Sequence, residues 1–250
     1  MLDYLTVRTT ETAESVKTTL ETYNKKKVDV KITNRALEAD RWYPMVLPFA
    51  TKVSEISKAF EDNYAVVNVP DENRTDGVVA FKLHVGEIKA NTLFLVKLED
   101  PWKAPEGEGT EIPAIKFTQR IIEYAGDDCV VYSGANKENE FHGVYVATKA
   151  EDPTWWYLKT NSATDNTFYN CGTNPTNISP LSGDIVTPEA AAARIIVEEA
   201  DGTITAINAI TGEAINNNAE GWYTVGGMKL EGQPTQKGVY INNGKKVVIK

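Results

Sequence analysis

The feature that most constrains the fold is a series of short β-strand patterns separated by polar or glycine-containing turns. Three of them follow one another in YAVVNV (64–69), VVAFKLHV (78–85) and NTLFLVKL (91–98). Short runs rich in Val, Phe, Leu and Tyr between turn residues are typical of strands. No helical pattern in the chain is long enough to cover a parallel sheet. The sequence therefore predicts a mainly β protein, a β-sandwich or a jelly-roll-like variant of one.

One or two short helices are expected among the strands. Residues 12–24 carry apolar side chains at helical spacing and begin with Thr12, which can cap a helix. Residues 51–60 place their apolar side chains on one side, as a helix packed on a sheet does. VDVKIT (28–33) alternates with period two and predicts a strand. The apolar segment 41–49 contains two prolines and fits an edge strand, because proline cannot donate to a central ladder.

The patterns divide the chain into four parts. These are an N-terminal helical segment, a β-sandwich domain, a linker and a C-terminal β tail, over 1–27, 28–200, 201–220 and 221–250. The linker is rich in Ala, Asn, Thr and Gly and poor in bulky residues. In the tail, Gly226-Gly227 and Asn243-Gly244 are hairpin turn signals between strand-like runs. A unit of this size is too small to fold well alone, so we expect it to dock or to be handed to a partner.

Composition and charge exclude several classes of partner. The net charge of −9 and the pI near 4.9 argue against nucleic acid and against an anionic membrane surface. No run of about 18 apolar residues is present, so no transmembrane segment is expected. The first residues have neither a basic start nor an apolar stretch, and without such a signal peptide the sequence alone predicts a cytoplasmic protein.

The two cysteines, Cys129 and Cys171, lie far apart in the sequence. They could be two free thiols, or they could form one disulfide in an oxidising compartment. Neither belongs to a CxxC pair or to a familiar zinc spacing. We therefore expect no metal and no cofactor, and leave the pairing of the cysteines open.

Several segments together resemble a known family. RWYPMVLPFATKVSEISKAF (41–60) resembles the W-x-x-x-x-LPF segment of a β domain repeated in secreted proteins of gut and oral Bacteroidales. Further segments of this chain resemble later motifs of the same domain: ANTLFLVK, WWYL, the Phe168-Tyr169 pair and PEAAAARIIVEEADGTITAI. The end of this chain, KGVYINNGKKVVIK, resembles the ending of those proteins. Leu93 stands where the family has proline, and Met228-Lys229 where it has Arg-Lys. The resemblance covers residues 28–250.

This resemblance implies an exported, secreted or outer-surface protein with a β-sandwich and without known catalytic residues. The resemblance outweighs the prediction of a cytoplasmic protein, which rests on the missing signal peptide. The tail, 221–250, resembles a C-terminal ending found on many exported proteins of those bacteria. We therefore expect the tail to act as a sorting or attachment signal, with export or attachment machinery as its partner.

The aromatic run Trp155-Trp156-Tyr157 is the main candidate ligand site, since aromatic faces stack on sugar rings. Neighbours in a strand point to opposite faces, so at most one of the two tryptophans can be core on a one-sided sheet. The other is then free to contact a glycan, although inter-sheet packing is the competing interpretation. Trp102, in a loop rich in Pro, Gly and Glu, is a second candidate, or it simply anchors its loop.

Catalytic motifs are missing from the sequence. HExxH, P-loop and dinucleotide-binding patterns are absent, and Ser133 is not in a G-x-S-x-G elbow. Acidic residues are plentiful in the loops, and they include Glu106, Glu108, Glu111, Asp127 and Asp128. A glycosidase needs two carboxyl groups that face each other across a cleft.

The sequence thus favours a surface module without catalysis, which binds a glycan or a host or cell-surface protein as an adhesin does, or serves as a spacer. Whether the protein is an enzyme stays uncertain, and the sequence leans against it. The alternative is a carbohydrate-active enzyme that uses carboxylates of its loops.

Overall fold

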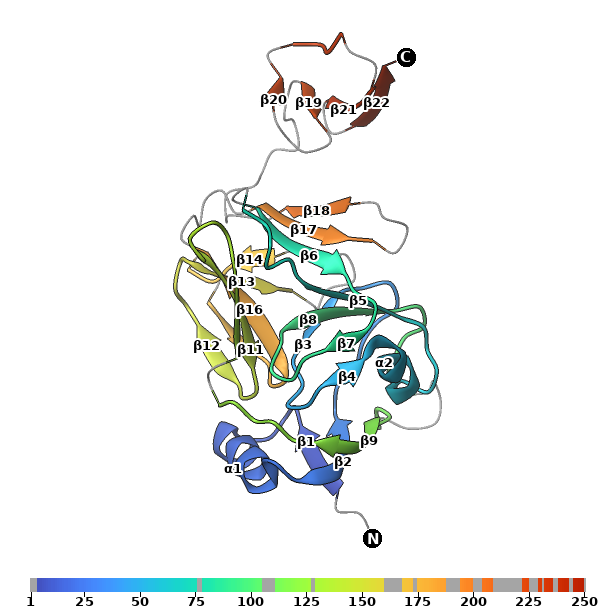
Figure 1. Cartoon of the computed structure of the whole chain (residues 1–250), viewed down its shortest axis with the longest axis vertical. Coiled ribbons are helices and arrows are strands. Elements are labelled where there is room, and N and C mark those ends of the chain that lie inside the picture. The colour runs from blue at the N-terminus through green and yellow to red at the C-terminus, as the bar shows by residue number, and fades with distance from the viewer. Residues whose placement is uncertain are drawn as a thin grey trace. The chain divides into compact units, whose positions relative to one another are not determined.

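The structure is a computed structural model of the whole chain, and two compact units can be distinguished in it, Met1–Gly212 and Glu213–Lys250. It describes residues 4–75, 78–104, 111–126, 129–159, 168–172, 175–187, 194–199, 204–208, 222–224, 229–230, 232–235, 238–242 and 245–249. In this part of the chain strands predominate, as Figure 1 shows, and the expected mainly β fold is confirmed. No helix in these residues is both long and apolar enough to cross a membrane.

Two large sheets form the body of the first unit. One has six described strands in the order β18-β17-β6-β5-β8-β3, and all its neighbours are antiparallel except β17 and β6. Its strands are β3 (Tyr43–Met45), β5 (Ala65–Pro70), β6 (Val79–Leu83), β8 (Phe94–Leu98), β17 (Arg194–Glu198) and β18 (Ile204–Asn208). The other is antiparallel, in the order β10-β11-β16-β13-β14. Its strands are β10 (Val130–Ser133), β11 (Asn139–Val144), β13 (Trp155–Leu158), β14 (Phe168–Asn170) and β16 (Ser182–Val186).

The two sheets share one apolar core, so they form a sandwich. Its side chains include Val66, Val79, Phe81, Leu95, Ile195 and Val197 from the six-stranded sheet, and Phe141, Trp156, Leu158, Phe168 and Ile185 from the five-stranded one. The rings of Phe81 and Phe141 meet edge to face across the interface, 5.1 Å apart. Because strand neighbours alternate in direction, the strands that line this core place their side chains alternately in it and on the opposite face.

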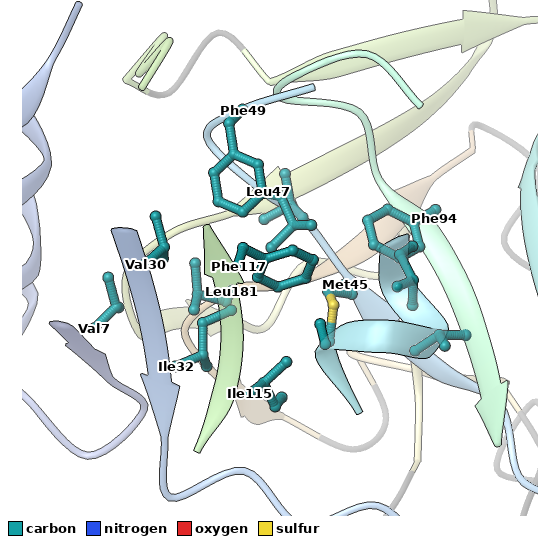
Figure 2. Packing of buried hydrophobic residues seen from close by; sticks show 14 of the residues in the cluster. Val7, Val30, Ile32, Met45, Leu47, Phe49, Phe94, Ile115, Phe117 and Leu181 are labelled. Carbon is teal, nitrogen blue, oxygen red and sulfur yellow. The ribbon is translucent and has the colours of Figure 1, made fainter. Parts of the chain in front are cut away.

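The six-stranded sheet is buried on both faces along β5 and β8. Val66 and Leu95 belong to the sandwich core, whereas their neighbours Val67 and Phe94 belong to a second, larger core. That core joins the sheet to a three-stranded sheet, β1 (Tyr4–Arg8), β2 (Lys27–Thr33) and β9 (Ile115–Ile121). Figure 2 shows side chains of β1, β2 and β9 gathered with those of the segment that follows β3.

The two helices of the described residues cover this second core. In α1 (Ala13–Tyr23), Val16 and Leu20 are buried, and the Thr12 hydroxyl accepts a hydrogen bond from the Ser15 N–H, as its capping role predicts. In α2 (Val53–Ala59), Ile56 and Ala59 are buried, and contacts with β5 and β9 hold the helix in place. Both expected helices are therefore present.

Two shorter sheets complete the first unit. β12 (Thr148–Ala150) pairs with β15 (Thr176–Ile178), and their residues Ala150 and Ile178 pack with Trp155 and Tyr157 of β13. These residues lie on the side of the five-stranded sheet that faces away from the sandwich core. The other short pair is β4 (Thr51–Lys52) with β7 (Glu87–Ile88). β3 lies at the edge of its sheet, where Pro44 is tolerated, as expected.

Two of the expected segments contain a strand that the sequence did not predict. The N-terminal segment 1–27 is not only helical, because β1 pairs in parallel with β2 and belongs to the same sheet. The linker 201–220 contains β18, which pairs with β17 over five residue pairs. The sequence of β18, ITAIN, is built largely of small and polar residues, and this composition hid its alternation.

The second unit contains a four-stranded antiparallel sheet in the order β20-β19-β21-β22. Its strands are β19 (Trp222–Thr224), β20 (Lys229–Leu230), β21 (Gly238–Asn242) and β22 (Lys245–Ile249). The pairing of Asn242 with Lys245 makes β21 and β22 a hairpin. The expected turn residues Gly226-Gly227 and Asn243-Gly244 lie outside the described residues.

Candidate functional site

An open cavity of about 440 Å³ lies where the three-stranded sheet meets the five-stranded sheet. The chain after β1 and after β2 forms one side of it, and the end of β13, β15 and the start of β16 form the other. Much of the wall is made of hydroxyl and amide side chains: Thr9, Thr10, Asn34, Thr176, Asn177 and Ser179. Such groups both donate and accept hydrogen bonds.

Hydrogen bonds between the ends of β1 and β2 fix one side of the cavity. The Thr9 hydroxyl donates to the Asn34 carbonyl at 2.7 Å, and the Asn34 side-chain amide donates to the Thr10 hydroxyl at 3.3 Å. Asn34 has a φ of +60°, a conformation that asparagine tolerates better than most residues. The chain turns there and carries Arg35 to the cavity wall.

Arg35 is held by backbone carbonyls. Its Nη1 donates to the carbonyl oxygens of Pro180 and Leu181 at 3.1 and 3.2 Å, and its Nη2 donates to that of Pro44. Its Nε is buried, and no described group bonds to it. Burial lowers the pKa of Arg35 to about 10, because the charged guanidinium is poorly solvated.

The turn that receives Arg35 is in an unusual conformation. Leu181 is buried and has a φ of +56°, the left-handed region that costs a residue with a Cβ about 1 kcal/mol or more. Its carbonyl oxygen and that of the preceding residue are the two that accept from Arg35 Nη1. Arg35 therefore links β3 to this turn and stabilises it.

Tyr157 is the predicted ligand-binding residue that lies on the cavity wall. It is partly buried, and its ring lies 5.9 Å from that of Tyr169 on the neighbouring strand β14, tilted by 33°. Burial raises the pKa of its phenol. Lys159, also on the wall, places its ammonium group 4.9 Å from the centre of the Tyr169 ring.

The other two residues of the aromatic run take opposite faces of β13. Trp156 is 0% exposed in the sandwich core, and Trp155 is partly buried on the outer face. This alternation is the one that the strand period predicts. Neither residue lines the cavity.

Trp102 is anchored in the second core and is only 6% exposed. Its backbone pairs with Leu37, its indole N–H donates to the Pro113 carbonyl at 3.1 Å, and its ring meets Phe60 edge to face at 5.3 Å. With this burial, the anchoring role fits the structure better than a ligand contact.

Cys129 and Cys171 are not joined by a disulfide, and both are buried in different apolar clusters. The disulfide alternative is therefore not what the structure has. Burial raises the pKa of Cys171 to about 12, so its sulfur stays protonated and is a poor nucleophile at neutral pH.

A charged cluster that the sequence did not reveal lies on the outer face of the five-stranded sheet. His142 Nε2 is 2.7 Å from Glu140 Oε2, and its Nδ1 is 3.2 Å from Oδ1 of Asp184, a buried carboxylate on the facing residue of β16. Burial of the ring lowers the pKa of His142, but the two carboxylates raise it by more, so the pKa lies above its ordinary value. Trp155 covers the imidazole edge to face at 5.9 Å.

This cluster holds charges together rather than presenting them to a substrate. The Asp184 side chain is 1% exposed, and no described nucleophile of lowered pKa lies beside His142. Only the pairing of β11 with β16 brings His142 and Asp184 together, and the sequence contains no signal for that pairing.

The loop carboxylates offer no catalytic pair in the described residues. Glu106, Glu108, Asp127 and Asp128 lie outside them, and Glu111 is exposed. Within the described ranges, no three His, Cys, Asp or Glu side chains are grouped so that they could hold a metal ion.

Comparison with known proteins gave no match to a family model, to a curated protein or to a solved structure. The geometry of the cavity is therefore the main guide to function.

Proposed function

We propose that this protein is an exported module of the cell surface that binds a saccharide, without catalysis, in the cavity beside Tyr157. The observation that carries the proposal is one open cavity that combines an aromatic side chain with a wall of hydroxyl and amide groups. Aromatic rings favour the apolar faces of sugars, and hydroxyl and amide side chains match their hydroxyl groups. Small-molecule sites commonly enclose roughly 300–1,000 Å³, a range that includes this cavity.

The alternative, a carbohydrate-active enzyme, has less support at this cavity. Glycoside hydrolysis commonly needs two carboxyl groups set across the scissile bond. None of the described residues that line the cavity is Asp or Glu. The wall can therefore hold a sugar, but its described side chains cannot supply this acid and base.

Binding of the purified chain to a glycan array tests the proposal. We expect binding to a subset of saccharides, and a loss of about tenfold or more in affinity for Tyr157→Ala. Tyr132→Ala is the matched control, because Tyr132 is 44% exposed on β10 and away from the cavity. An array without any signal, or equal binding by Tyr157→Ala and the unchanged chain, would contradict the proposal and favour a spacer or a protein-binding role.

Export is the second part of the proposal, and the C-terminal tail supports it. The tail resembles the ending of exported proteins, and the compact unit Glu213–Lys250 contains it as a small sheet of its own. We propose that residues 221–250 are read by export or attachment machinery. Deleting them in the native host should leave the protein in the periplasm or the medium, whereas unchanged surface labelling of intact cells would count against a sorting role.

A further inference from the structure

We propose that the cavity beside Tyr157 selects an acidic saccharide, one whose sugar ring carries a carboxylate or a sulfate group, and that Arg35 and Lys159 attract this group. The inference rests on the proposed saccharide binding and adds the charge of the ligand to it.

The first reason is the charge of the cavity wall. The protein as a whole has 35 acidic and 26 basic residues, and its net charge is −9. The described residues of the wall include Arg35 and Lys159, and none of them is acidic. A concave surface with one sign of charge raises the local concentration of ligands of the opposite sign. This cavity therefore favours an anion although the net charge of the protein is negative.

The second reason is the state of the Arg35 guanidinium. Its three hydrogen bonds go to backbone carbonyl oxygens, and no described carboxylate pairs with it. A poorly solvated cation without a counter-charge is costly, and an anion that enters the cavity reduces that cost. Charge-assisted bonds to a carboxylate or sulfate are stronger than bonds between neutral groups. An acidic sugar would thus gain more from this wall than a neutral one.

The third reason is that the guanidinium is already in position. The carbonyls of Pro44, Pro180 and Leu181 hold it from β3 and from the turn before β16. Binding then orders few additional side chains, and a preorganised site loses less affinity to entropy than a mobile one. The strained φ of Leu181 fits a turn that is held in place for such a purpose.

Calorimetric titration with three matched oligosaccharides tests the inference. One is an oligogalacturonide, the second is the same oligomer with its carboxyl groups reduced to alcohols, and the third is a sulfated form of that neutral oligomer. We expect the neutral oligomer to bind at least about tenfold more weakly than an anionic one. The preference for the anion should also shrink as the salt concentration rises towards about 1 M.

Variants assign the effect to the cavity. Lys159→Gln should lower the affinity for the anionic oligomer a few-fold and leave that for the neutral oligomer unchanged. Arg35→Gln should lower it further, and its circular dichroism is compared with that of the unchanged chain because Arg35 also holds the turn at Leu181. Lys116→Gln removes the same charge from an exposed position on β9, away from the cavity, and should have no effect.

Each result is decisive for one of the two proposals. Tighter binding of the uronide alone identifies a carboxylate, and tighter binding of the sulfated oligomer alone identifies a sulfate; both support the inference. Equal affinity for the anionic and the neutral oligomers overturns the inference and leaves saccharide binding intact. If none of the three binds and the glycan array is also empty, the proposed function itself fails. Anionic binding that Lys159→Gln does not weaken places the ligand elsewhere and overturns the inference.

Discussion

The two faces of strand β13 differ in burial and in polarity. On the inner face, Trp156 and Leu158 are buried at 0% and 4% exposure among large apolar side chains of the sandwich core. On the outer face, Trp155 and Tyr157 are only partly buried, and their neighbours include an ion pair and an open polar cavity. One strand thus contributes to the fold with one face and to the candidate site with the other.

The four residues of β13, WWYL, therefore alternate between packing in the core and lying beside the candidate site. The inner face needs shape and apolar area, because close packing stabilises the sandwich. The outer face tolerates polar groups, because the short pair β12–β15 covers only part of it and leaves the cavity open. Substitutions on the two faces should therefore affect different measurements.

The largest expected effect is on the inner face, at Trp156. Trp156→Ala removes a large buried ring and should lower the free energy of unfolding by about 3–5 kcal/mol. Urea denaturation followed by circular dichroism measures the change. Trp156→Phe should cost clearly less, because the buried indole N–H has no hydrogen-bond partner among the described residues and its loss leaves nothing unpaired. Equal losses of stability for both variants would contradict this expectation.

A smaller effect is expected on the outer face, at His142. His142→Ala leaves the buried Asp184 without its cationic partner and should lower the free energy of unfolding by about 2 kcal/mol. Glu140→Gln is the control, since Glu140 is more exposed and should matter less. If the two variants lower the free energy of unfolding equally, the burial of Asp184 does not determine how much its pairing with His142 contributes.

The same cluster predicts a dependence of stability on pH. The folded-state pKa of His142 lies above its unfolded value of about 6.5. The cluster therefore contributes its full stability below that unfolded value and loses it as the pH rises through the folded pKa. Urea denaturation at a series of pH values should show this decline in the unchanged chain and a flatter profile in His142→Gln. A rise in stability over this range that depends on His142 would reverse the sign and rule out the assigned pairing.

The sequence was sufficient to predict most of the strands that line the sandwich core, but not the contacts on the outer faces of those strands. Short apolar runs between turn residues predicted the strands in 64–69 and 91–98, and alternation predicted the strand in 28–33, because both patterns are local and need no knowledge of the partner strand. The same alternation predicted that Trp155 and Trp156 would separate. The strands β1 and β18 are among those that were missed, and β18 is made largely of small and polar residues.

The candidate site was predicted only in part, at Tyr157. Arg35 and Lys159 are more than 120 residues apart, and they share a wall only because the chain after β2 meets the end of β13. His142 and Asp184 likewise meet through the pairing of two strands that are not consecutive. Such meetings depend on sheet order and register, and a local pattern contains neither.

The smallest expected effect on stability is at Tyr157, and it completes the comparison of the two faces. Its ring is partly buried beside the cavity, so Tyr157→Ala should lower the free energy of unfolding by only about 1 kcal/mol. Tyr157→Phe keeps the ring and removes only the hydroxyl, and should stay within about 0.5 kcal/mol of the unchanged chain. Chemical denaturation measures both, with Trp156→Ala as the reference on the same strand. If Tyr157→Ala lowers the free energy of unfolding as much as Trp156→Ala does, both faces of β13 stabilise the fold. Weaker saccharide binding by Tyr157→Ala could then reflect unfolding. A small loss instead ties any change in binding to the cavity itself.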